Sequence, residues 1–181
     1  MKRTFFYYVF MALAVMTLAS ACDKDDFDAD YPSDEIEYDG SRKILVAYFS
    51  ATGNTQRRAE EIVAATGADV YRIEASEPYA SNPYDDSDRI QNESYNNLRP
   101  GVGNLPESID EYDVIFVGSP IWWHNPAMVV CTFLENYDLD GKIVIPFFTY
   151  GSTEYLQQSI DKIHEVTPAS VHLRTYTGGG V

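Results

Sequence analysis

An apolar run, a hydroxyl-rich turn and a helical pattern follow one another in ILVAYF-SATGNT-QRRAEEIV, residues 44–63. The apolar run predicts a buried strand, and a helix is expected to start in residues 56–63. Such a junction attracts an anion, because the first helical turn offers unpaired N–H groups and the positive end of its dipole. Gly53 would let the chain turn tightly around the anion. The residues equally fit an ordinary loop in which Thr55 is only the N-cap of the helix.

The composition of this turn narrows the kind of anion. The pattern G-x-x-x-x-G-K-[ST] of nucleotide triphosphatases is missing, and no lysine lies between Lys43 and Lys142. The G-x-G-x-x-G spacing of dinucleotide sites is missing as well. Neutral donors, the hydroxyl groups of Ser50, Thr52 and Thr55, suit one terminal phosphate monoester. Flavin mononucleotide (FMN) is the candidate ligand.

Strand-like and helix-like segments alternate along the rest of the chain. Strands are expected at residues 44–50, 69–73, 114–119, 143–148 and 170–176. Alternation of this kind predicts an α/β fold with a doubly wound, five-stranded parallel sheet. The intervening helices are expected near Ala59 to Val63, from Pro126 as a first helical position to Glu135, and from Leu156 to Ile163.

Two parts of this pattern are irregular. The last strand alternates apolar and polar residues, as an edge strand does, and no helix follows it before Val181. We therefore interpret the last helix as missing and the C-terminus as truncated. The connection from Glu74 to Asp113 is long, with a short helix expected between Tyr84 and Asn97, and it is either a binding cover or merely structural.

The N-terminus has the features of a bacterial lipoprotein. Residues 1–21 have a basic start, a short apolar stretch and small residues, as a secretory signal peptide does, and Cys22 follows in a position that resembles a lipobox. Lipidated Cys22 would anchor the protein to the membrane of the bacterial cell envelope, at the periplasmic face or the outer surface. An ordinary cleaved signal with a chance cysteine is the alternative.

Charge divides the mature chain into two parts. Residues 22–41 contain nine acidic residues and one lysine and predict a disordered tether, which is either a surface-export signal or a solvated spacer. Residues 42–181 remain as one domain. The net charge of −15 makes nucleic acid an unsuitable partner. Cys131 lies in an apolar segment and is interpreted as a small buried residue.

The expected third strand continues into GSPIWWHNP, residues 118–126. Two adjacent tryptophans in a loop suggest that a flat molecule lies against them. Together with YFS-A-TGNT, YDVIFVG before PIWW, then FLE and GK, this order of motifs resembles the flavodoxin family, particularly its flavodoxin-like lipoproteins, over residues 43–176. The resemblance implies a sheet order of 2-1-3-4-5, with the ligand at the carboxyl ends of the first and third strands, a rule for which flavodoxins are themselves a standard example.

The resemblance also implies a set of FMN-binding residues. Trp123 would stack on the flavin ring, whereas Trp122 is interpreted as a core residue and Tyr150 as a weaker contact. No residue is assigned a catalytic or metal-binding role. The phosphate loop would contain Ser50, Thr52, Gly53, Asn54 and Thr55, the loop beside the ring Pro120, Ile121, Trp122, Trp123 and His124, and the third loop Thr149, Tyr150, Gly151 and Ser152.

One departure from the family concerns His124, which stands where similar sequences often have glycine. A side chain there makes a positive φ costly. The expected function is electron transfer between envelope partners, a redox protein or a quinone. A nicotinamide-dependent FMN or quinone reductase, an FMN-dependent oxidoreductase, is one alternative, and a flavin-free binding module on the same fold is another.

Overall fold

Five parallel strands form the centre of the computed structural model, which describes residues 41–173. Their order is β2-β1-β3-β5-β6, which confirms the predicted arrangement 2-1-3-4-5. The strands are β1 (Ile44–Tyr48), β2 (Asp69–Arg72), β3 (Val114–Trp122), β5 (Ile143–Thr149) and β6 (Val171–His172). Because β1 pairs with β2 on one side and with β3 on the other, the chain reverses its direction of winding between β1 and β3.

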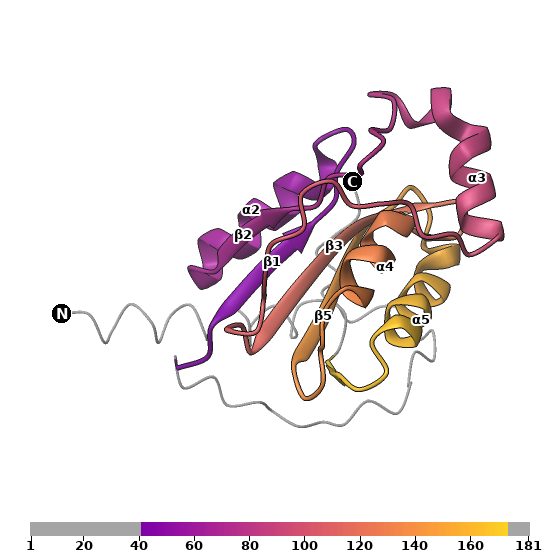
Figure 1. Ribbon diagram of the computed structural model, residues 1–181. Coiled ribbons are helices and arrows are strands. Elements are labelled where there is room, and N and C mark those ends of the chain that lie inside the picture. The colour runs from indigo at the N-terminus through magenta and orange to yellow at the C-terminus, as the bar shows by residue number, and fades with distance from the viewer. Residues whose placement is uncertain (1–40, 174–181) are drawn as a thin grey trace, which may run out of the picture. The chain divides into compact units, whose positions relative to one another are not determined.

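Helices cover both faces of the sheet (Figure 1). Helix α2 (Asn54–Thr66) packs Ala59 and Ile62 against Val46, Tyr48 and Phe147 on one face. Helices α4 (Met128–Glu135) and α5 (Leu156–Val166) cover the other face. Side chains alternate between faces along a strand, so β1 contributes to both layers of the core.

Helix α2 begins two residues earlier than the sequence pattern indicated. Gly53 has a φ of 87° and is the N-cap, so Asn54 is the first helical residue and Thr55 lies inside the first turn rather than at the cap. Gly67 ends the helix with a φ of 71°, and its N–H donates to Val63 O at 2.8 Å. The two glycines supply the left-handed conformations that the ends of this helix require.

The structure differs from the sequence-based expectation around the paired tryptophans. Strand β3 continues to Trp122 and folds back into β4 (Asn125–Pro126), which is antiparallel to it. Pro126 therefore pairs with Ile121 instead of starting helix α4, which begins at Met128. Among the described residues, strand β6 covers Val171–His172, and residues 174–176 of the expected strand 170–176 lie outside the described part.

The long connection between β2 and β3 contains the short helix that was expected there. A 3-10 helix, η1 (Pro83–Asp86), leads directly into α3 (Ser87–Tyr95). The ends of this excursion are joined, because Ser76 N–H donates to Gly101 O at 2.8 Å and Ala75 bridges to Val102. The residues between these points form an excursion whose two ends meet, and α3 lies past the ends of the sheet strands (Figure 1).

The predicted signal peptide, Cys22 and almost all of the acidic tether lie outside the described residues. Within residues 41–173, no helix is both long enough and apolar enough to cross a bilayer.

Candidate functional site

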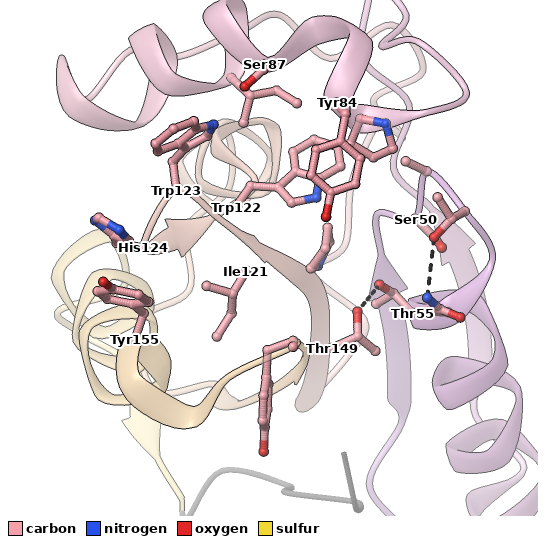
Figure 2. A pocket seen from close by; sticks show the side chains of 18 of the residues that line it. Ser50, Thr55, Tyr84, Ser87, Ile121, Trp122, Trp123, His124, Thr149 and Tyr155 are labelled. Atoms are coloured by element: carbon pink, nitrogen blue, oxygen red, sulfur yellow. Dashed lines mark hydrogen bonds between the residues drawn. The ribbon is translucent and has the colours of Figure 1, made fainter. Parts of the chain in front are cut away.

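A pocket of about 670 Å³ opens at the carboxyl ends of β1, β3 and β5. It lies at the reversal of strand order, where open α/β sheets bind ligands, as flavodoxins themselves exemplify. Every residue expected at the site lines the pocket except Gly53, which shapes the turn: Ser50, Thr52, Asn54, Thr55, Pro120, Ile121, Trp122, Trp123, His124, Thr149, Tyr150, Gly151 and Ser152. The topology therefore brings three distant loops to one cavity (Figure 2).

The turn at residues 50–55 closes through its own groups. Gly53 N–H donates to Ser50 Oγ at 3.1 Å, which leaves the Ser50 hydroxyl hydrogen available to another acceptor. The first intrahelical bond runs from Arg57 N–H to Gly53 O at 3.0 Å, so the N–H groups of Asn54 and Thr55 precede it. These donors and the helix dipole make the N-terminus of α2 favourable for an anion.

A hydroxyl pair joins this turn to the end of β5. Thr55 Oγ1 and Thr149 Oγ1 lie 2.9 Å apart, and both side chains are buried (Figure 2). Only one of the two hydroxyl groups donates within the pair, so the other keeps its hydrogen for a ligand oxygen. Thr52, by contrast, is exposed.

Two guanidinium groups contact the turn, where the sequence predicted only neutral donors. Arg72 Nη2 donates to Ser50 O at 3.1 Å, and Arg57 Nη2 donates to Asn54 Oδ1 at 2.9 Å. Neither arginine lines the pocket. Arg72 could have been found from the sheet order, because it pairs with Tyr48 on the neighbouring strand and so ends beside the turn.

The paired tryptophans have different surroundings. Trp122 makes edge contacts with Phe49 and Tyr79, each with ring centroids 5.3 Å apart, and packs against the main core. Trp123 lines the pocket and is 38% exposed, and its ring makes an edge contact with that of Tyr95, with centroids 6.0 Å apart. Both indoles line the pocket, and that of Trp123 is the more exposed of the two (Figure 2).

Trp123 and His124 form the two-residue turn between β3 and β4. Their φ angles are 47° and 74°, both in the left-handed region. The histidine side chain therefore does not prevent the positive φ that glycine adopts easily. Its ring stacks on Tyr155 with centroids 3.7 Å apart, and this contact helps to hold the conformation.

Tyr155 lines a wall of the pocket that was not predicted from the sequence. The 3-10 helix η2 (Thr153–Tyr155) follows the third loop, and Ser152 Oγ accepts from Glu154 N–H at 3.2 Å to begin it. This turn carries Tyr155 back to the cavity. Partial desolvation, and then Glu154, raise the pKa of the Tyr155 phenol, so it remains protonated at neutral pH.

The excursion between β2 and β3 provides the remaining wall, for which the sequence indicated a possible cover but no particular residues. Tyr84 is 87% exposed although it lines the pocket. No local pattern identifies these residues, because only the path of the excursion brings them to the cavity. They are Asn82, Pro83, Tyr84, Ser87 and Ile90.

Buried polar contacts fix the shape of this excursion. Glu93 accepts from Tyr79 Oη at 2.6 Å and from Arg89 Nε at 2.8 Å. The Arg89 guanidinium also donates to the carbonyl oxygens of Glu77 and Pro78. Burial, and then the bond to Glu93, raise the pKa of Tyr79, which stays a neutral donor. These hydrogen bonds therefore stabilise the pocket wall that α3 forms.

Cys131 lies away from this site. Its side chain is fully buried on α4, and burial raises the pKa of the thiol to about 12. Within residues 41–173, no group of histidine, cysteine or acidic side chains is arranged to hold a metal ion.

Sequence and structure comparisons relate this chain to known proteins. The profile of the family described as Flavodoxin matches residues 43–176. A crystal structure named as a candidate flavoprotein from Bacteroides eggerthii DSM 20697 is 37% identical, with a TM-score of 0.68, over 77% of this chain and 91% of that one. A flavoprotein from Lactobacillus acidophilus NCFM, solved in complex with FMN, is 25% identical, with a TM-score of 0.63, over 74% of this chain and 91% of that one. Among curated protein sequences, none matches this chain.

Proposed function

The chain belongs to the flavodoxin family, and from this premise we propose that it binds FMN in the pocket and transfers electrons. The observation that carries the proposal is the division of one cavity into a hydroxyl-rich end and an aromatic end. FMN has the same division, with a phosphate at one end and a flat ring at the other. The neighbour from Lactobacillus acidophilus, solved with FMN, supports this assignment.

The donor set at residues 50–55 fits the phosphate. Ser50 and Thr55 are buried and prearranged by bonds to Gly53 and Thr149, so little ordering is needed when an anion arrives. Hydrogen bonds to a charged phosphate are about twice as strong as those between neutral groups. Arg57 and Arg72 add positive charge behind the turn and offset the repulsion from a chain of net charge −15.

The aromatic end fits the ring. Trp123 would lie along one face of the flavin, with Tyr150 as a weaker candidate from the third loop. Stacking of flat aromatic systems contributes about 0.5 to 1.5 kcal/mol beyond the area buried. Bound FMN supplies the capacity to accept and return electrons, and the residues of this chain bind the phosphate, orient the ring and limit its contact with water.

Retention of flavin tests the proposal. Purified protein mixed with FMN and passed through gel filtration should elute with the visible absorption bands of flavin. Loss of all flavin on the column would contradict FMN binding and favour a flavin-free binding module. A Trp123→Ala variant treated in the same way should retain less flavin than the wild type.

The proposed activity is exchange of electrons with a redox protein or a quinone. Apart from glycine and aliphatic residues such as Pro120 and Ile121, the pocket residues that would touch the flavin carry hydroxyl, amide or aromatic side chains, which tune a flavin rather than react with it. FMN-loaded protein reduced chemically without oxygen should pass its electrons to a soluble quinone. Rapid reduction by NADH alone would instead assign the protein to the reductases.

The location that we propose is the bacterial cell envelope, with a lipid on Cys22. The support is the signal-like segment 1–21 followed directly by this cysteine. Two acyl chains on one residue are enough for stable membrane attachment. Cys22→Ser should move the protein to the soluble fraction or block processing, whereas Cys131→Ala, the matched control, should not. Unchanged membrane fractionation of Cys22→Ser would contradict the anchor.

A further inference from the structure

The turn that carries Trp123 has a conformation that its own sequence does not favour. Trp123 and His124 both have left-handed backbone angles, at φ of 47° and 74°. Side chains larger than glycine avoid this region because the Cβ atom approaches the backbone oxygen. Contacts from outside the turn must therefore hold it.

Helix α3 supplies one set of these contacts. Ser94 Oγ donates to Trp123 O at 2.6 Å, and Asn125 Nδ2 donates to Ser94 Oγ at 2.9 Å. The side chains of Ser94 and Asn125 are 6% and 7% exposed. Because the Trp123 carbonyl belongs to the peptide plane between Trp123 and His124, the Ser94 bond fixes that plane directly.

Helix α5 supplies the second set from the opposite side. Gln158 Nε2 donates to Asn125 Oδ1 at 3.4 Å, which extends the chain of donors from α5 through Asn125 and Ser94 to Trp123. Ser159 Oγ donates to His124 O at 3.4 Å, and Tyr155, from η2 just before α5, stacks on the His124 ring. All donors in the chain point the same way, an arrangement in which each bond polarises the next.

We propose that Ser94 and Asn125 are positioning residues that hold the Trp123–His124 turn in its left-handed form before any ligand binds. Neither residue lines the pocket, so each acts on a ligand only through the Trp123–His124 turn. This inference rests on the proposed function for the identity of the ligand, FMN. It also ties α3, which contributes Ser87 and Ile90 to the pocket, to the wall that receives the flavin ring.

Ser94→Ala tests the proposal without removing any pocket residue. In the ligand-free protein, the indole N–H signal of Trp123 should shift or split in the NMR spectrum, while that of Trp122 stays in place. Affinity for FMN and for riboflavin should fall by the same factor, about fivefold, because the ring wall is disturbed and the phosphate turn is not. Ser170→Ala, which removes a 3.0 Å bond to Leu139 O at the other end of the sheet, is the matched control and should change neither.

A double-mutant cycle with His124→Gly separates positioning from a general structural role. Glycine adopts the left-handed conformation without help and so relieves one of the two strained positions, and the loss caused by Ser94→Ala should be clearly smaller in that background. An equal loss in both backgrounds would overturn the proposal. So would a Trp123 signal and flavin affinities in Ser94→Ala that match the wild type.

Two further results keep the proposal distinguishable from the function on which it rests. Failure of the wild type to bind FMN would remove the proposed function, and the Trp123 signal of the ligand-free variant would then decide the proposal alone. If Ser94→Ala does not fold, Asn125→Ala replaces it, because it removes the donor to Ser94 Oγ. A Trp123 signal unchanged in Asn125→Ala would then contradict the proposal.

Discussion

Two turns at the same edge of the sheet, residues 50–55 and residues 122–125, reach their shapes in opposite ways. The first turn closes through neighbours in sequence: Gly53 takes the left-handed position and donates to Ser50 three residues away. The second places Trp123 and His124 in left-handed positions and is bonded by Ser94 and Ser159, which lie 29 and 35 residues away. The backbone conformation of the first turn is thus set by its own residues, although Thr149 and Arg72 also bond to it, whereas that of the second turn depends on contacts from distant helices.

The difference has an energetic consequence. A left-handed glycine costs little in the folded state, whereas a larger side chain in that conformation costs about 1 to 2 kcal/mol. In the second turn, tertiary contacts must offset this cost at two residues, Trp123 and His124. Substitutions in helices α3 and α5 should therefore change the conformation of the turn at residues 122–125 and leave that of the turn at residues 50–55 unchanged.

The largest expected effect separates the two tryptophans. Trp122→Ala should lower the free energy of unfolding by about 3 kcal/mol, because the indole packs against Phe49 and Tyr79 in the core. Trp123→Ala should cost less than about 1 kcal/mol in stability but weaken FMN binding roughly tenfold and release the quenched flavin fluorescence. Urea unfolding and fluorescence titration measure the two quantities.

The reverse outcome would change the assignment. If Trp122→Ala folded normally and lost flavin while Trp123→Ala kept both affinity and quenching, the stacking residue would be Trp122.

Acid should weaken α5, which holds the second turn, more than α2, which carries the first. His164 at the end of α5 stacks on His172 of β6 with ring centroids 3.9 Å apart. Burial, and then His172, lower the pKa of His164 to about 4, whereas an unfolded histidine has a pKa of about 6.5. Between these values the unfolded chain binds a proton that the folded chain does not, so the stabilisation present above pH 6.5 is lost as the pH falls.

Hydrogen exchange compares the two helices. With His164 partly exposed, the loss between pH 7 and pH 5 should be about 1 kcal/mol. After correction for intrinsic rates, protection should fall more in residues 156–166 than in residues 54–66. His164→Gln should reduce this difference, and equal losses in the two helices would contradict the assignment.

The smallest effect concerns glycine itself. Gly53→Ala should lower the free energy of unfolding by about 1 kcal/mol through backbone strain alone, because no atom lies within 4 Å of the added Cβ. His124→Gly should change it by less than about 0.5 kcal/mol, since relief of strain offsets the lost contact with Tyr155. A neutral Gly53→Ala, or a His124→Gly more stable by over about 1 kcal/mol, would break the comparison. Urea unfolding measures both.

The same division explains which features were predictable from the sequence. The parallel, doubly wound sheet followed from alternating strand and helix patterns, and its order followed from the resemblance to the flavodoxin family. Every expected pocket residue except Gly53 lines the cavity. The hydroxyl-rich turn at residues 50–55 is determined by residues next to one another in the sequence, so its conformation could be predicted. Only the earlier start of α2, at Asn54, was not. Its supporting arginine, Arg72, comes from another strand and was missed.

The β3–β4 hairpin and the pocket residues in the β2–β3 connection and in η2 were harder to predict for a physical reason. Pro126 was expected to start a helix because proline favours that position, but pairing with Ile121 overrides the local preference. Tyr84 and Tyr155 reach the cavity through the paths of η1 and η2. No pattern in neighbouring residues encodes those paths, since long-range contacts determine them.

Parallel titration with FMN and riboflavin tests most directly whether the hydroxyl turn holds a phosphate and the tryptophan turn holds a ring. The two ligands share the flavin ring, and only FMN has the phosphate. The Thr52→Val/Thr55→Val variant should lose about tenfold in FMN affinity and less than about twofold in riboflavin affinity, because the lost hydrogen bonds are made to a charged group. An equal loss for the two ligands would contradict the account, since the hydroxyl turn would then have no role specific to the phosphate.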